Sequence, residues 1–167
     1  NEQDMFATLF IGVLDMETGV LDYCNGGHNA PVLVHKRECR QLEVLPNLPI
    51  GIMGGFEYVG QTTQIQRGDT LFLYTDGLTE AENKVHAQYG EERMLNLLAT
   101  TDGMPPRELV ETFQKDVDDF VNGAPQSDDL TMLAIRYQIS AIVMRNDIQQ
   151  IPTLSEWVDG LHVPEEL

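Results

Sequence analysis

The sequence predicts an α+β fold, in which antiparallel strands form the sheets and the helices are gathered in one part of the chain. Three observations support this fold class. Most apolar runs before residue 75 are short, rich in β-branched and aromatic residues, and bounded by turn residues, as in strands. Two segments with helical periodicity follow, and one strand-like run comes after them. This order indicates antiparallel sheets with helices packed on an outer face.

The first part of the chain consists of strands joined by turns. The run Phe6 to Leu14 is apolar and is expected to be a buried strand, and Val20 to Cys24 is expected to be the next. The turn residues at 16–19 predict that these two strands form a hairpin. Pro31 to His35 is a further strand, and Lys36 to Arg40 is expected to be a polar turn.

The second part of the chain contains the helices. Residues 105–121 place apolar side chains on one helical face, with prolines at the start and Asn122-Gly123 as the stop signal. A loop rich in Pro and Gly is expected at 46–56, followed by strands at 58–66 and 70–74. A shorter helix is expected at 91–99 and a last strand at 130–137.

The charge of the chain excludes several classes of partner. Its 167 residues include 27 acidic and 10 basic side chains, for a net charge of −17. Binding to nucleic acid or to an anionic membrane requires clustered Lys and Arg, so neither is expected as a partner. The sequence has no apolar run of membrane-spanning length and no signal peptide. Cys24 and Cys39 lack metal-type spacing and are expected to be reduced thiols of a cytoplasmic protein.

Two acidic motifs carry most of the chemical information. Asp76 follows an apolar strand-like run and precedes Gly77, which permits a close approach of the backbone. Asp128 and Asp129 follow a loop and precede the last strand-like run. Carboxylates at strand ends suit Mg²⁺ and Mn²⁺, and a divalent cation would relieve the repulsion between neighbouring acids. Taken alone, Asp76 is better explained as a turn-capping residue, and Asp128 and Asp129 as a solvated loop end.

The turn formed by Asn25, Gly26, Gly27 and His28 is a third candidate. A histidine in a glycine-rich turn is usually a turn residue and nothing more. The turn could take part in the chemistry only if it faces the carboxylates. Asn25 and His28 are therefore treated as possible peripheral residues of the acidic site.

Together, these motifs resemble those of the SpoIIE/RsbU-like branch of the metal-dependent type 2C (PPM) protein serine/threonine phosphatases. The matching segments occur in the order found in that family, and their combination is specific although each is short. The segments are FATLFIGVLD (6–15), NGGHNAP (25–31), LPIG (48–51), GD (68–69), YTDGLTEA (74–81), YGEER (89–93) and APQSDDLT (124–131).

The resemblance implies an α-β-β-α sandwich, in which two antiparallel sheets are flanked by helices and a two-metal Mn²⁺ or Mg²⁺ site lies at one end of the sheets. It implies a protein phosphatase that hydrolyses phosphoserine or phosphothreonine with a metal-activated water. Such enzymes act in bacterial partner-switching pathways that regulate sigma factors. The implied substrate is a phosphorylated anti-sigma-factor antagonist.

The resemblance also implies roles for individual residues. By match, Asp76 and Asp128 are expected to bind the metals and to be catalytic. Gly77 and Asp129 are expected in the same metal site, with Asp129 outside the direct ligand set. The Asn25–His28 turn matches a segment that approaches the metals in related enzymes, which makes its two polar residues possible peripheral groups.

One departure from the family pattern concerns the first metal motif. In the family, an Asp followed by a glycine-rich turn bridges the two metals, and no such motif precedes Phe6. The chain is therefore expected to lack the early strands, the first helices and a complete active site. Bare sheet edges predict homodimers or exchanged elements. The alternative function is a non-catalytic scaffold or regulatory domain with the phosphatase fold.

Two domains are expected. Residues 1–138 are predicted to be the C-terminal portion of a type 2C-like phosphatase domain. Residues 139–167 resemble the opening strand and helix of an anti-sigma-factor-type ATPase domain of the histidine-kinase-like class, without any nucleotide-binding motif. The other interpretation of this segment is a C-terminal extension that packs on the first domain.

Overall fold

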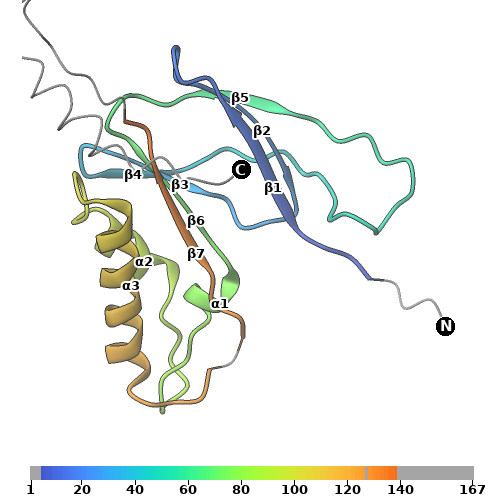
Figure 1. Cartoon of the computed structure of the whole chain (residues 1–167). Coiled ribbons are helices and arrows are strands. Elements are labelled where there is room, and N and C mark those ends of the chain that lie inside the picture. The colour runs from blue at the N-terminus through green and yellow to red at the C-terminus, as the bar shows by residue number, and fades with distance from the viewer. Residues whose placement is uncertain (1–4, 127, 139–167) are drawn as a thin grey trace, which may run out of the picture.

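A computed structural model describes residues 5–126 and 128–138 of the chain. Two antiparallel sheets lie against each other, and helices cover the outer face of one of them (Figure 1). The predicted second domain, residues 139–167, lies outside the described residues, and its assignment stays a prediction. In the described part of the chain, no helix has the length and apolar character needed to cross a bilayer.

The first sheet has three strands in the order β1-β2-β5. These strands are β1 (Leu9–Leu14), β2 (Val20–Gly26) and β5 (Gln61–Gln64). Strands β1 and β2 pair antiparallel, with Leu14 opposite Leu21, which confirms the predicted hairpin. Asp15 stabilises the turn, since its Oδ1 accepts hydrogen bonds from the backbone N–H of Glu17 and Thr18 at 2.8 and 3.0 Å.

The second sheet has four strands in the order β4-β3-β6-β7. They span Glu38–Gln41 (β4), Val32–His35 (β3), Thr70–Tyr74 (β6) and Met132–Arg136 (β7). Strand β4 corrects the expected polar turn at 36–40. Only Lys36 and Arg37 form the turn, with φ of 47° and 70°, the left-handed backbone of a two-residue hairpin loop. The polar residues after them pair with β3 as an edge strand.

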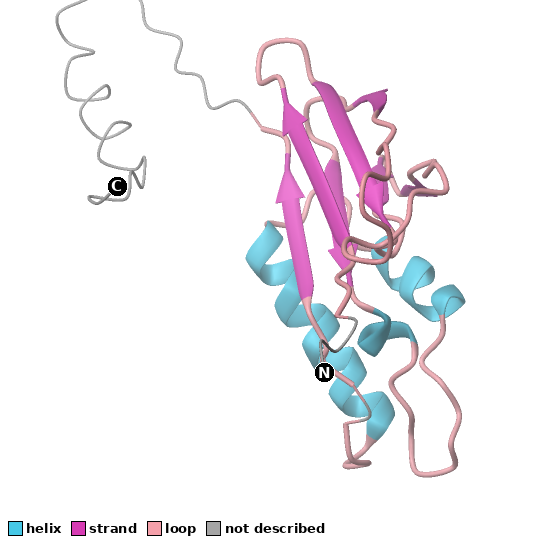
Figure 2. Cartoon of the chain, turned by 90° about the vertical axis from the view of Figure 1, so that its right-hand side faces the viewer, coloured by secondary structure: helices cyan, strands magenta, loops and turns pink. Residues whose placement is uncertain are grey.

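Three helices follow β6 and precede β7 (Figure 2). They are α1 (Asp76–Thr79), α2 (Glu91–Leu98) and α3 (Pro106–Val121). Helix α3 ends at Asn122, whose φ of 47° is left-handed, and the backbone N–H of Asn122 donates to the Asp118 carbonyl. Both long helices are where periodicity predicted them, whereas the single turn of α1 was not anticipated.

The core has two parts, one on each face of the four-stranded sheet. Alternate residues of β3 and β6 point to opposite faces, so Phe72 packs against the helices while Leu71 packs against the first sheet. On the helix side, the rings of Phe72 and Phe113 stack with centroids 4.9 Å apart. The described residues therefore form three layers, sheet, sheet and helices. This confirms the α+β class and the paired sheets of the expected sandwich.

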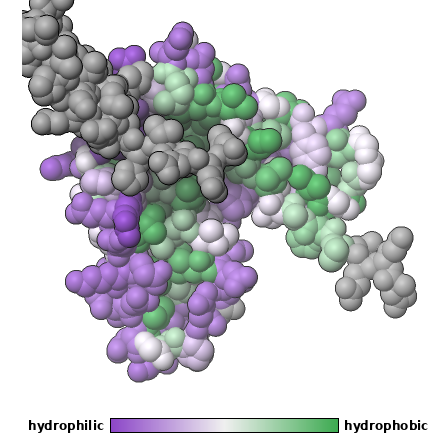
Figure 3. Space-filling model, viewed as in Figure 1, coloured by the Kyte–Doolittle hydropathy of each residue, from purple (hydrophilic) through white to green (hydrophobic). Residues whose placement is uncertain are grey.

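Strand β1 corrects the expectation of a buried strand at 6–14. It begins at Leu9 and lies at the edge of its sheet, with Ile11 57% and Val13 71% exposed. Figure 3 shows hydrophobic surface over this strand and the loop beyond it, in contrast to the hydrophilic helical part. The apolar pattern is that of a covered strand, but nothing within the described residues covers this face.

Helices α2 and α3 are joined by a bidentate ion pair. Arg93 Nε and Nη2 donate to the Asp116 carboxylate, both at 2.9 Å, and Tyr89 Oη donates to the same group at 2.6 Å. The hydrogen bond from the Arg93 guanidinium, followed by that from Tyr89, holds the pKa of Asp116 below its ordinary value, although partial burial opposes this shift.

We expect Asp116→Asn to lower the free energy of unfolding by about 1 kcal/mol at neutral pH, since both side chains are partly exposed. A carboxyl group with a lowered pKa stabilises the fold above its unfolded-state pKa, and this contribution is lost as the pH falls through the folded-state value. Urea unfolding should therefore show a difference from wild type at pH 7 that shrinks as the pH falls through the folded-state pKa of Asp116. Asp119→Asn, an exposed carboxylate on the same helix, is the control, and a pH-independent difference would contradict this account.

Candidate metal centre

The predicted site residues meet at one end of the two sheets. Strand β6 ends at Tyr74, which pairs with Met132 at the start of β7, so the segments holding Asp76 and Asp128 leave the sheet side by side (Figure 1). Strand β3 is antiparallel to β6 and begins at this same end. Asn25 lies near the end of β2, and His28 lies in the loop that connects β2 to β3, so this turn is at the end of the sheets where the acidic motifs lie.

Thr75 joins the two acidic motifs. Its Oγ1 donates to the Asp129 carbonyl at 2.7 Å and accepts from the Thr131 backbone N–H at 2.9 Å. Its own backbone N–H donates to the Thr131 carbonyl at 3.1 Å. These bonds fix the loop before β7 against the turn after β6. The sequence analysis missed this residue, because a hydroxyl between a strand and an Asp-Gly pair carries no signal until its partner 54 residues away is known.

Gly77 allows the two segments to approach closely. A Cβ atom at this position would lie 2.5 Å from the Asp129 carbonyl oxygen and 2.8 Å from its carbon. Backbone atoms cannot move aside as a flexible side chain can, so only glycine fits here. The sequence predicted a close backbone approach at this glycine, and the approaching group is the backbone of the second acidic motif.

The carboxylates of the motifs are exposed, and toward the described residues they form only local hydrogen bonds. Asp76 Oδ1 accepts from the Gly77 backbone N–H at 3.1 Å, and Asp128 Oδ1 accepts from the Asp129 backbone N–H at 2.7 Å. Among the described residues, none of the three aspartates forms a salt bridge. Oxygen atoms of all three side chains are therefore left available for a cation.

The chemistry of this donor set fits Mg²⁺ or Mn²⁺, which prefer carboxylate oxygens. The set is partial, however. Within residues 5–126 and 128–138, no group of three or more His, Cys, Asp or Glu side chains is placed to hold a metal ion. The residues that are present can supply one wall of a metal centre, and a stable site needs further ligands.

The Asn25–His28 turn is closed by its own side chain. Asn25 is 2% exposed; its Nδ2 donates to the His28 carbonyl at 2.8 Å, and its Oδ1 accepts from the His28 backbone N–H at 2.7 Å. The His28 imidazole is half-buried, with Nδ1 3.5 Å from Thr8 Oγ1. The structure thus gives the Asn25 amide a turn-closing role, and a peripheral role of both side chains near metal stays a prediction.

Comparisons with known proteins agree with this architecture. The family model described as Stage II sporulation protein E (SpoIIE) matches residues 1–138. Protein IcfG from Synechocystis is 29% identical over 131 residues, which cover 78% of this chain and 20% of IcfG. The chain thus spans about a fifth of that curated relative.

Two solved structures share the fold. One is the phosphatase domain of SpoIIE from Bacillus subtilis, presoaked with Mn, which matches with a TM-score of 0.63 at 16% identity. The match covers 82% of this chain and 59% of the SpoIIE chain. The RsbU and RsbW domains of Rv1364c from Mycobacterium tuberculosis have a TM-score of 0.66 at 23% identity, covering 91% of this chain and 44% of that one. With the family model matching most of the sequence, the chain belongs to the SpoIIE family.

Proposed function

We propose that this protein is the phosphatase module of a signalling protein, in which Asp76 and Asp128 bind Mn²⁺ or Mg²⁺ and the phosphate of phosphoserine or phosphothreonine is hydrolysed. One observation carries the proposal. Thr75 joins two acidic motifs that are distant in sequence, and the carboxylates of both motifs are exposed and free of ion pairs in the described structure. Such an arrangement leaves carboxylate oxygens of both motifs available to a divalent cation.

Each residue has a distinct role in this proposal. Asp76 and Asp128 are the direct ligands, and Gly77 lets their backbones come close. Asp129 holds the second motif in place through its carbonyl, and its carboxylate lies outside the direct ligand set. A bound metal would supply Lewis-acid activation for hydrolysis. A two-metal centre needs more ligands than these two aspartates supply.

The substrate class follows from family membership and charge. A phosphorylated protein fits a SpoIIE-family phosphatase, and we propose an anti-sigma-factor antagonist in a cytoplasmic partner-switching pathway. The net charge of −17 argues against nucleic acid as a partner. The exposed edge strands β1 and β7 leave backbone groups free to pair, which supports homodimer formation.

The second candidate function is a non-catalytic scaffold or regulatory domain. The partial donor set favours it, since fewer than three suitable side chains meet within the described residues. The exposed carboxylates favour the phosphatase, because a scaffold has no need to hold acids together without cationic partners.

Release of phosphate from a phosphoserine peptide distinguishes the two functions. The assay compares this chain with a version extended upstream by about 90 residues, enough to complete a domain of usual size. We expect release that depends on Mn²⁺ in the extended protein and is abolished by a chelator. Activity in neither protein would support the scaffold. Activity in both proteins would mean that the residues of this chain complete the site without the upstream extension.

A further inference from the structure

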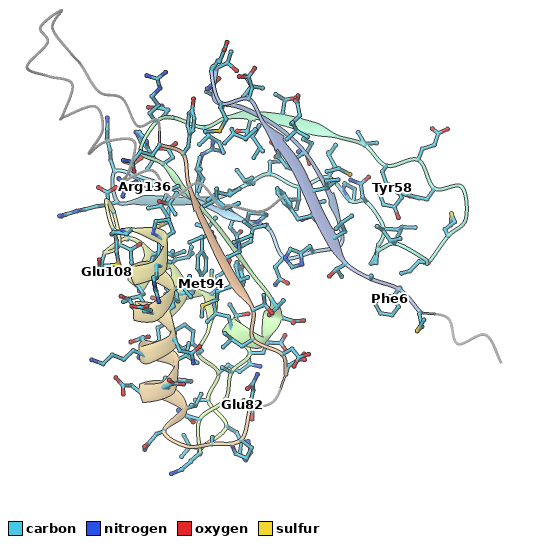
Figure 4. All side chains as sticks on the ribbon, in the orientation of Figure 1. Phe6, Tyr58, Glu82, Met94, Glu108 and Arg136 are labelled. Carbon is cyan, nitrogen blue, oxygen red and sulfur yellow. The ribbon has the colours of Figure 1, made fainter. Side chains whose placement is uncertain are left out.

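A groove lies between two loops, close in the chain to the acidic motifs. Its inner part is a cleft of about 400 Å³, and its lining includes Gly77 and Leu130, which are the neighbours of the two acidic motifs. Its outer part, of about 510 Å³, lies between residues 82–86 and 123–126. The two parts share Glu82, which Figure 4 shows at this end of the molecule, and the 123–126 loop. We call the whole cleft the flank groove.

The first wall of the flank groove is an exposed loop with its own internal order. Asn83 Oδ1 accepts from the backbone N–H groups of Val85 and Ala87 at 3.0 and 3.1 Å, and the Asn83 N–H donates to the Ala87 carbonyl. His86 Nδ1 lies 2.9 Å from Glu82 Oε2. The Val85 side chain is 80% exposed, so it does not pack in the hydrophobic core. The hydrogen bonds within this loop hold the first wall of the flank groove in its shape.

The opposite wall is the turn that ends α3. Asn122 and Gly123 both have left-handed backbone, with φ of 47° and 76°, and the Ala124 N–H donates to the Val121 carbonyl at 3.0 Å. Backbone geometry and hydrogen bonds therefore define both walls of the flank groove. A preformed groove binds an extended segment without the entropic cost of ordering its walls.

The outer part of the flank groove has a lysine in its lining, whereas none of the described residues that line the inner part is Lys or Arg. Glu82 lies against His86, and Asp118 Oδ1 accepts from Gln114 Nε2 at 3.0 Å, so both acids of the lining are engaged. Lys84 is the one Lys or Arg side chain that lines the outer part, and it forms no salt bridge with any described residue. A free cation in a strongly acidic chain is an attachment point for a carboxylate.

We infer that the flank groove binds the polypeptide beside the phosphorylated residue of the substrate, and that Lys84 selects an acidic side chain in that flank. The inference rests on the proposed phosphatase function, because Gly77 and Leu130, which directly follow Asp76 and Asp129, line the inner end of the groove. The apolar floor, which includes Val117, Val121 and Leu130, takes up the segment between the phosphate and the acidic side chain. Lys84 is thus a specificity-determining residue that takes no part in hydrolysis.

Peptide binding to the isotopically labelled chain tests this inference by NMR. The probes are alanine-based phosphoserine peptides, each carrying a single Glu at a different position on either flank, with a matched set carrying Gln. In at least one register, we expect the Glu peptide to bind about 1.4-fold to five-fold tighter than its Gln partner, the range for one exposed ion pair. The shifted amide signals should come from residues 82–86 and 123–126.

Two charge-reversal variants decide the role of the lysine. Lys84→Glu should abolish or invert the preference for Glu, whereas Lys115→Glu, an equal charge change on the outer surface of α3, should preserve it. Equal Glu and Gln affinities in wild type, an equal effect of both variants, or signals that do not shift in the groove would each overturn the inference. Hydrolysis of p-nitrophenyl phosphate, which has no polypeptide flank, reports separately on the proposed function.

Discussion

Replacing Asp76 with asparagine is expected to abolish phosphate release by the extended protein, with a fall of more than about 100-fold. Even residues that only support metal ligands cost about 10-fold to 100-fold when changed, so loss of a direct ligand should exceed that range. Asparagine keeps the size and one oxygen of the side chain but removes the charge that attracts a divalent cation. Initial rates at saturating Mn²⁺ measure the effect.

The fold should tolerate this change. Asp76 is exposed, and the one hydrogen bond of its side chain with a described residue is to the N–H of Gly77. Without metal, removal of one of several neighbouring negative charges relieves repulsion, so the free energy of unfolding should stay constant or rise. Normal Mn²⁺-dependent activity in Asp76→Asn would show that this residue is not a ligand. Loss of activity together with unfolding would leave the structural role as the better explanation.

Replacing Gly77 with alanine is expected to destabilise the protein by about 1–3 kcal/mol, the usual cost of forcing extra atoms into a packed position. The backbone at Gly77 is helical, so intrinsic propensity alone would favour alanine by about 1 kcal/mol. The contact decides the outcome, since the added Cβ would lie 2.5 Å from the Asp129 carbonyl oxygen. The second acidic motif must move, so phosphate release should fall as well.

Gly54→Ala is the matched control for this substitution. Gly54 has no heavy atom within 4 Å of a Cβ position, and its φ is not left-handed. Thermal unfolding of both variants should show a lower midpoint for Gly77→Ala only. An unchanged or raised midpoint for Gly77→Ala would mean that the two acidic motifs are not held together as described.

The strongest sequence patterns predicted their elements well. Strand β6 occupies the predicted residues 70–74, and α3 occupies 106–121 against a prediction of 105–121. Both segments are buried against the core, where apolar periodicity reflects the environment directly. Boundaries of exposed elements were less accurate, since β5 covers only 61–64 of the predicted 58–66.

The errors occurred where tertiary contacts determine the structure. The residues of β4 are mostly polar and exposed, so their sequence resembles a turn, and only pairing with β3 makes them a strand. Strand β1 has an apolar pattern that would suit a buried position, yet it is exposed in the described structure. Patterns indicate which face tends to be buried, but they do not show what is available to bury it.

The candidate site was predicted in composition but not in geometry. The motifs indicated Asp76 and Asp128, and the structure brings their segments to one end of the sheets. The sequence could not show that Thr75 joins them, nor that the Asn25 amide is occupied by its own turn. Both facts depend on contacts between residues whose side chains are ordinary turn formers in isolation.

Direct binding of Mn²⁺ to the extended protein tests the central claim, that Asp76 and Asp128 hold the same metal centre. Titration calorimetry compares wild type, Asp76→Asn, Asp128→Asn and the double variant, with Asp102→Asn, an exposed carboxylate between α2 and α3, as the charge-matched control. The account predicts that each single site variant loses more than about tenfold in affinity and that the double variant loses little more, since ligands of one centre are not additive. Wild-type affinity in Asp128→Asn, or losses that simply add in the double variant, would contradict it.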